Sequence, residues 1–94
     1  MKLNFNQPFI DLDGKQIEET NQGKTLSQAL AQSLDAKETD VLKFWDWATK
    51  LHKGEEIDLD QADQVKLKAF IDKSNFNVLV KHNLLENFSK KEKK

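Results

Sequence analysis

The sequence predicts an α+β fold that is mostly α, with an N-terminal β-hairpin packed on three to four short helices. Near the start, short alternating stretches flank an Asp-Gly pair, which is typical of a hairpin turn. After it, apolar residues recur at the three- and four-residue spacing of amphipathic helices. We expect residues 1–89 to form a single compact domain and residues 90–94 to form a disordered, Lys-rich tail.

The β candidate is the stretch 3–17. Asp13-Gly14 lies between IDL and KQI, and a type I′ turn needs positive φ at both central positions, which favours this dipeptide. An isolated hairpin is marginal in water, so one face of it must contact the helices. Residues 18–24 are predicted to be a loop. The side chains expected on the helix-facing side are Ile10, Leu12 and Ile17.

The first predicted helix covers 25–34, with Thr25 as N-cap and Gln28 completing a capping box. The second covers 39–53. It is expected to begin at Thr39 or Asp40 and to end before a Gly54 in the left-handed C′ position.

Two more helices are predicted over 60–73 and 77–88, separated by a turn at Ser74-Asn75. The tetrapeptide IDLD, first seen in the hairpin, recurs at 57–60 without a following glycine. There Asp60 is expected to cap the third helix, while the preceding isoleucine and leucine fix the entering chain to the core.

The composition excludes several classes of protein. The 94 residues contain no cysteine, so we expect no disulfide, no thiolate metal site and a reducing, cytoplasmic location. The first residues lack the apolar core of a secretory signal, and no apolar run is long enough to span a bilayer, so no membrane partner is expected.

The charge distribution argues against nucleic acid as the partner. The last six residues have a net charge of +3, so the preceding 88 carry −4 within a total of −1. All 15 basic residues are lysine, and arginine is the residue preferred for bidentate contacts with guanine and phosphate.

No motif predicts a cofactor or a metal site. The stretch DLDG at 11–14 lacks calcium-loop spacing, because Phe9 and Thr20 occupy the positions that require an oxygen ligand and a glutamate. His52 and His82 have no zinc-motif spacing. The glycines form no phosphate-binding pattern, and no carboxylate lies in an apolar run that would raise its pKa. We therefore expect a protein that is not an enzyme.

The sharpest feature is FWDW at 44–47. Trp45 and Trp47 lie about 200° apart on a helix, so a single flat contact cannot bury both. In one interpretation the second helix is central, with the hairpin and the last helix covering different flanks. In the other, Trp47 stays exposed as an anchor for a partner or a second copy of the chain. The candidate partner-binding residues are Trp47, Leu51, Leu42 and Trp45.

Five stretches cover most of the chain: FIDLDGKQI, GKTLSQALAQSL, VLKFWDWATKLHKGEEIDLD, VKLKAFIDKS and VLVKHNLLENF. Their order and hydrophobic spacing resemble a group of small, poorly characterised accessory proteins encoded by bacteriophages and prophages. The resemblance implies a non-enzymatic, protein-binding role in virion assembly or host interaction, and a host-cytoplasmic location if the chain is phage-encoded. No functional residue is carried over from it.

The leading expectation is therefore a small protein–protein interaction module, with a homodimer as one form of it. It would use the Trp47 side of the second helix or a face of the last one. The alternative is a nucleic-acid-associated accessory protein, in which the helices 39–53 and 60–73 and the Lys-rich tail supply the contacts. Acidic residues interleaved with the lysines of 60–73 weigh against this alternative, because they would repel phosphate.

Overall fold

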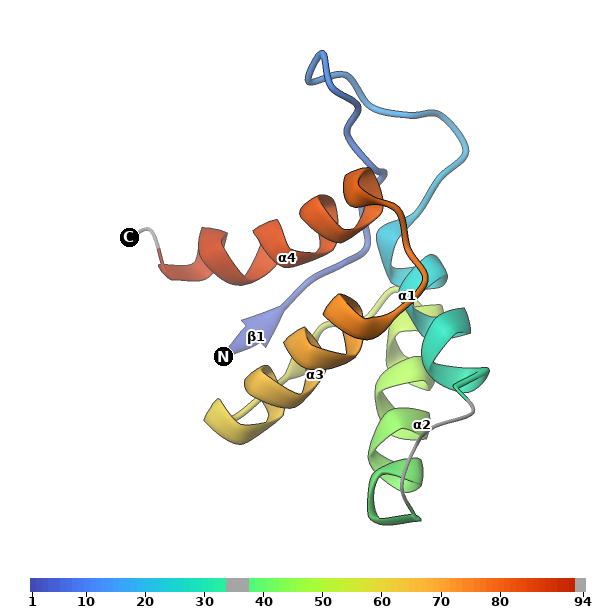
Figure 1. The fold of residues 1–94 in the computed structure, drawn as a ribbon, viewed down its shortest axis with the longest axis vertical. Helices are drawn as coiled ribbons and strands as arrows, with labels where there is room; N and C mark the ends of the chain where they lie inside the picture. The colour runs from blue at the N-terminus through green and yellow to red at the C-terminus, as the bar shows by residue number, and fades with distance from the viewer. Residues whose placement is uncertain (34–37, 93–94) are drawn as a thin grey trace.

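The computed structural model describes residues 1–33 and 38–92. Over these ranges the chain forms four helices and one two-stranded antiparallel sheet, which confirms the predicted α+β, mostly helical class (Figure 1). The elements are β1 (Lys2–Leu3), α1 (Gln22–Ala31), α2 (Glu38–His52), β2 (Ile57–Asp58), α3 (Gln61–Lys73) and α4 (Val78–Glu92).

The sheet joins the N-terminus to the connection between α2 and α3. Lys2 lies opposite Asp58, and Leu3 lies opposite Ile57. Leu3 and Ile57 are both buried. The second IDLD therefore contributes a strand that the sequence did not predict, because a two-residue strand is too short to show alternation. As predicted, Ile57 and Leu59 attach the chain to the core.

The loop at 11–15, called the tip loop below, replaces the predicted type I′ turn. The Asp11 N–H donates to the carbonyl of Lys15 at 2.8 Å, and the Gly14 N–H donates to the carbonyl of Asp11 at 3.0 Å. Gly14 has φ +82°, whereas Asp13 does not have positive φ. This is the pattern of a three-residue hairpin loop, a type I turn followed by a left-handed glycine.

The Asp11 side chain accounts for the different turn. Its Oδ1 accepts hydrogen bonds from the backbone N–H groups of Asp13 and Lys15, each at 2.9 Å. One bridge, Ile10 to Gln16, closes the loop. The prediction that Leu12 would contact the helices is wrong: its side chain is 96% exposed at the tip.

Helix α1 begins three residues earlier than predicted. Its N-cap is Asn21, whose Oδ1 accepts from the N–H of Lys24 at 2.9 Å, so the predicted cap at Thr25 lies inside the helix. The early start is held by tertiary contacts, because the N–H of Gln22 donates to Gln7 and that of Gly23 to Phe5, both at 2.8 Å. These contacts with the N-terminal segment leave no periodic signal in the sequence.

The C-terminal end of α2 agrees with the sequence more closely. Gly54 has φ +82°, and the N–H groups of Gly54 and Glu55 bond back to Leu51 and Lys50, which is the Schellman arrangement. Thr39 and Asp40, the predicted N-caps, both lie within α2. The residue before this helix is outside the described residues.

Helix α4 starts next to Asn77, whose Oδ1 accepts from the N–H of Val80 at 2.9 Å. It continues to Glu92, beyond the predicted end at 88. Residues 90–92 of the predicted disordered tail therefore lie within this helix. Residues 93–94, the rest of that tail, lie outside the described part of the chain.

Asp60 is the N-cap of α3, and its Oδ1 accepts from the N–H of Asp63 at 2.8 Å. We expect Asp60→Ala to lower the free energy of unfolding by about 1 kcal/mol, because an orphan N–H of the first turn loses its acceptor. Asp60→Asn keeps the acceptor and is expected to change stability by a few tenths of a kcal/mol. Urea titration followed by circular dichroism measures both; equal losses in the two variants would contradict the capping role.

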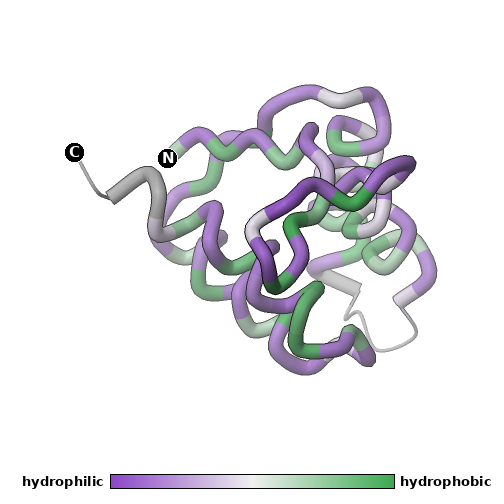
Figure 2. Tube along the Cα trace, turned by 90° about the horizontal axis from the view of Figure 1, so that it is seen from above, coloured by the Kyte–Doolittle hydropathy of each residue, from purple (hydrophilic) through white to green (hydrophobic). Residues whose placement is uncertain are grey.

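The core lies where the N-terminal segment meets the helices. Phe5 is fully buried and meets the ring of Phe88 edge-on at 6.2 Å between centroids. Hydrophobic and hydrophilic segments alternate along the helical traces in Figure 2, as expected for helices with one apolar face. Within the described ranges, no helix is both long and apolar enough to cross a bilayer.

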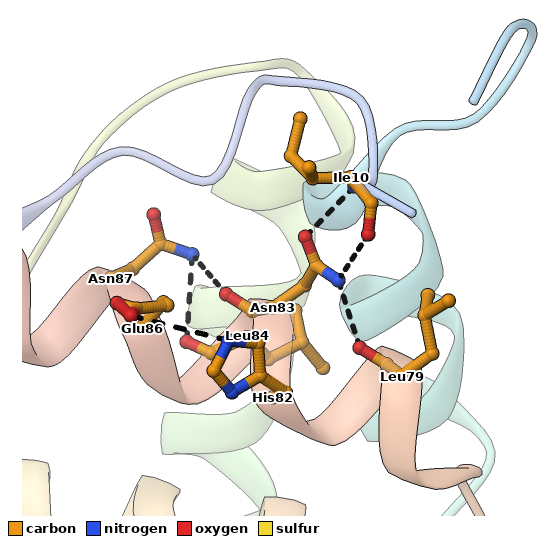
Figure 3. Close-up of polar contacts among 7 residues, drawn as sticks. All are labelled: Ile10, Leu79, His82, Asn83, Leu84, Glu86 and Asn87. Carbon is orange, nitrogen blue, oxygen red and sulfur yellow. Dashed lines mark hydrogen bonds and ion pairs between the residues drawn. The ribbon is translucent and has the colours of Figure 1, made fainter. Parts of the chain in front are cut away.

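Buried amide side chains hold the N-terminal segment on α4. Asn83 Oδ1 accepts from the N–H of Ile10 at 2.9 Å, and its Nδ2 donates to the carbonyl of the same residue at 3.0 Å, so it imitates a strand partner (Figure 3). One turn later, Asn87 Oδ1 accepts from Gln7 Nε2 at 2.6 Å and its Nδ2 donates to Gln22 Oε1 at 2.8 Å. These amides connect α4, α1 and the N-terminal segment.

Candidate functional site

The two tryptophans of FWDW lie on different sides of α2. Trp47 is 4% exposed and Leu51 is 1% exposed, so the hypothesis that these two residues bind a partner is wrong: both belong to the core. Leu42 and Trp45 are 80% and 63% exposed. Of the four candidate residues, these two remain available on the surface.

The burial of Trp47 follows from its neighbours. Its ring stacks on Phe44 with centroids 5.8 Å apart, and Phe44 in turn meets Phe70 of α3 edge-on at 5.4 Å. Helix α1 packs along α2, and β2 also contacts it. The expectation that α2 is a central helix thus agrees with its neighbours, but α1, β2 and α3 cover it in place of the hairpin and α4.

A shallow apolar groove lies between α1 and α2, with Trp45 in its wall. Its volume is about 300 Å³. The small side chains of Ala31 and Ala48 leave the space between the two helices open. The groove, called the Trp45 groove below, is lined by Ser27, Gln28, Ala31, Trp45, Ala48, Thr49, His52 and Lys53.

The contribution of α1 to the lining of this groove was not predicted from the sequence. Function was assigned to α2 alone because the tryptophans dominate the hydrophobic pattern there. The available signal was weak: Gln28 and Ala31 lie three residues apart and so share a face of α1 that lacks large apolar side chains. Where such a face meets a neighbouring helix, its side chains do not fill the space between the two helices.

The groove carries a positive charge at one end. Among the described residues that line it, Lys53 is positively charged and none is acidic. Lys53 lies at the C-terminal end of α2, next to the exposed His52. Lys50, one turn earlier, is paired with Asp46 at 3.3 Å. The groove is therefore apolar along its length and basic at one end.

Elsewhere on α2, lysines and carboxylates link this helix to α3. Lys43 Nζ donates to Asp63 Oδ1 at 2.6 Å, and this hydrogen bond raises the pKa of Lys43. Lys66 Nζ donates to Asp40 Oδ1 at 2.9 Å. These two lysines, Lys43 and Lys66, are thus partly neutralised by neighbouring carboxylates.

The two histidines lie on different helices, α2 and α4. His52 lines the groove, whereas His82 lies on α4, 4.0 Å from Glu86. Over residues 1–33 and 38–92, no three histidine or acidic side chains gather as metal ligands would. In the tip loop, Asp11 Oδ1 is occupied by two backbone N–H groups.

Comparisons of the chain with protein-family models, with curated proteins and with solved structures found no match. No residue role is therefore transferred to this chain from another protein. The exposed tryptophan and the groove beside it are the features from which its function is inferred.

Proposed function

We propose that this chain is a small, non-enzymatic interaction module that binds a polypeptide at the Trp45 groove. The exposed indole of Trp45, beside an apolar groove, is the observation that carries the proposal. Tryptophan is enriched among residues that dominate binding energy, and an apolar patch with a polar rim is typical of an interface. Leu42, one helical turn before Trp45, extends the same surface.

The volume of the groove suits apolar side chains of a partner. An apolar cavity of about 150 Å³ is large enough to take benzene, so about 300 Å³ accommodates one or two apolar side chains of a partner. No carboxylate is found among the described residues that line the groove. The two hydroxyls that line it, those of Ser27 and Thr49, each donate to a backbone carbonyl of their own helix at 2.8 Å. These features support binding without catalysis.

The nucleic-acid alternative has less support. Its proposed contacts were the α2–α3 pair and the Lys-rich tail. In that pair, Lys43 and Lys66 already donate to Asp63 and Asp40. Phosphate would have to displace these carboxylates, which carry the same sign of charge.

We further propose that the chain is a phage or prophage accessory protein that acts in the cytoplasm of the host. Support for this source comes from the resemblance of its sequence pattern alone. The position of its coding sequence tests it: neighbouring virion or prophage genes are expected, and a chromosomal setting without them would contradict the proposal.

A photo-cross-linking experiment tests the binding surface. A photo-reactive phenylalanine derivative at position 49 places the probe in the groove, and the same derivative at position 72, an exposed position on α3, is the matched control. In host cells, a covalent adduct with a polypeptide is expected from position 49 and not from position 72. Adding Trp45→Ser to the position-49 variant is expected to reduce the adduct at least tenfold. Equal adducts from both positions, or none from position 49, would refute the proposal.

A further inference from the structure

The tip loop exposes one apolar side chain, that of Leu12, on a backbone that local hydrogen bonds hold in one conformation. Leu12 is 96% exposed, while the two hydrogen bonds to Asp11 Oδ1 and the left-handed Gly14 fix the backbone around it. Scattered surface leucines are common. This one differs because it stands at the apex of an ordered loop and touches nothing that would need an apolar residue there. Fixing such a loop before binding reduces the entropy lost on association.

We infer that the tip loop of one copy docks into the Trp45 groove of a second copy, with Leu12 inserted between α1 and α2. The inference rests on the proposed function and names the partner as the chain itself. Leucine matches the apolar lining of the groove, and its volume is well within about 300 Å³. Trp45 would form one wall around the inserted side chain.

The charges of the two surfaces are complementary. Asp11 and Asp13 flank Leu12, and Glu18 and Glu19 follow in the same exposed segment, so the loop is acidic despite Lys15. The groove contains Lys53 at one end, and none of the described residues that line it is acidic. Opposite charges around an apolar contact favour encounter and fix the orientation of docking.

The contact must form between copies. In Figure 1 the tip loop projects at one end of the long axis, while α2 extends toward the other end, so the loop does not lie over its own groove. A loop-to-groove contact closes a two-fold dimer when two copies exchange tips, and it produces rings or filaments when the copies dock head to tail.

The first test is the mass of the chain as a function of concentration, by light scattering up to about 1 mM, which covers weak association. The mass is expected to rise above the 10.9 kDa of the monomer. Leu12→Ser is expected to weaken association about 10- to 100-fold, the effect of losing one buried leucine. Val78→Ser, which alters another highly exposed apolar residue at the start of α4, is the matched control and is expected to change nothing. A constant monomer mass, or equal association in Leu12→Ser, would overturn the inference.

Mixing two defective variants gives the sharper test. Ala31→Glu places an acidic side chain in the groove while leaving the tip loop intact, and Leu12→Ser does the reverse. Each variant alone is expected to be a folded monomer by circular dichroism. Their equimolar mixture is expected to form a complex of twice the monomer mass that grows no further, because one intact tip meets one intact groove. Failure to form this complex would overturn the inference.

The outcomes separate the two proposals. A chain that stays monomeric but forms a position-49 adduct with a different polypeptide overturns self-docking and leaves the interaction module standing. The absence of any position-49 adduct refutes both.

Discussion

Trp47→Ala is expected to lower the free energy of unfolding by about 3–5 kcal/mol, the usual cost of truncating a buried aromatic side chain. The indole is 4% exposed and stacks on Phe44, so its removal opens a cavity in the core and leaves Phe44 with Phe70 as its remaining aromatic neighbour. Small domains are stable by about 5–15 kcal/mol, so this single change removes a large share of the total.

Trp45→Ala is the matched control, because it makes the same chemical change two residues away on the same helix. Trp45 is 63% exposed and alanine favours helix, so we expect a stability change within about 0.5 kcal/mol. Urea titration of both variants, followed by circular dichroism, gives the two free energies. Losses of similar size would show that the two indoles do not have the separate roles assigned to them.

The same pair shows how far the sequence determines the site. Helical geometry established that Trp45 and Trp47 face different directions, and this is confirmed. It did not reveal which of them faces the core, because both sides of α2 carry apolar residues. That choice depends on where α1 and α3 pack, and neither position follows from the pattern of α2 itself. As a result, two of four predicted binding residues are core residues.

The elements of the fold also differ in how well the sequence predicts them. Local signals were sufficient where a single residue determines the backbone: Asp60 caps α3, and Gly54 ends α2 in a left-handed conformation. They failed where distant segments meet. The pairing of Leu3 with Ile57 and the early start of α1 at Gln22 both depend on contacts with the N-terminal segment, which have no signature within either stretch.

The amide network explains why the N-terminal segment forms so little regular strand. Ile10 obtains both of its backbone hydrogen bonds from the Asn83 side chain, and Gln22 Nε2 donates to the carbonyl of Pro8 at 3.0 Å. Side chains of α4 and α1 thus satisfy groups that a sheet would otherwise pair. Asparagine and glutamine on a helix ordinarily indicate a solvent-exposed face, so the sequence gives no sign of this arrangement.

Removing one member of this network is the second substitution expected to have a large effect on stability. We expect Asn87→Ala to lower the free energy of unfolding by about 2–4 kcal/mol, because Gln22 Oε1 and Gln7 Nε2 both lose a partner and an unsatisfied buried group costs about 1–3 kcal/mol. Gln22 is 3% exposed, so water cannot readily replace the lost donor. Urea titration measures the loss, and a change below about 1 kcal/mol would show that the network contributes little.

Asn87→Asp separates hydrogen bonding from packing, because it preserves shape and replaces the Nδ2 donor by an acceptor. The new oxygen would face Gln22 Oε1 at 2.8 Å and the carbonyl of Asn83 at 3.2 Å. Rotating the Gln22 amide does not help, since its Nε2 would then leave the carbonyl of Pro8. Burial and these oxygens favour the protonated carboxyl, so its pKa in the folded state is expected to exceed the unfolded value of about 4.

The sign of the pH dependence follows from that raised pKa. Above about pH 4 the unfolded variant has lost the proton while the folded one retains it, so folding binds a proton and stability falls as pH rises, until the folded pKa is passed. The deficit relative to the wild type is therefore expected to be smallest below about pH 4 and largest at neutral pH. Asn77→Asp, the same change at the exposed N-cap of α4, is expected to show no such loss, because a carboxylate there still accepts from Val80 and is favoured by the helix N-terminus. A deficit in Asn87→Asp that does not vary with pH would show that folding does not raise the pKa of the new carboxyl.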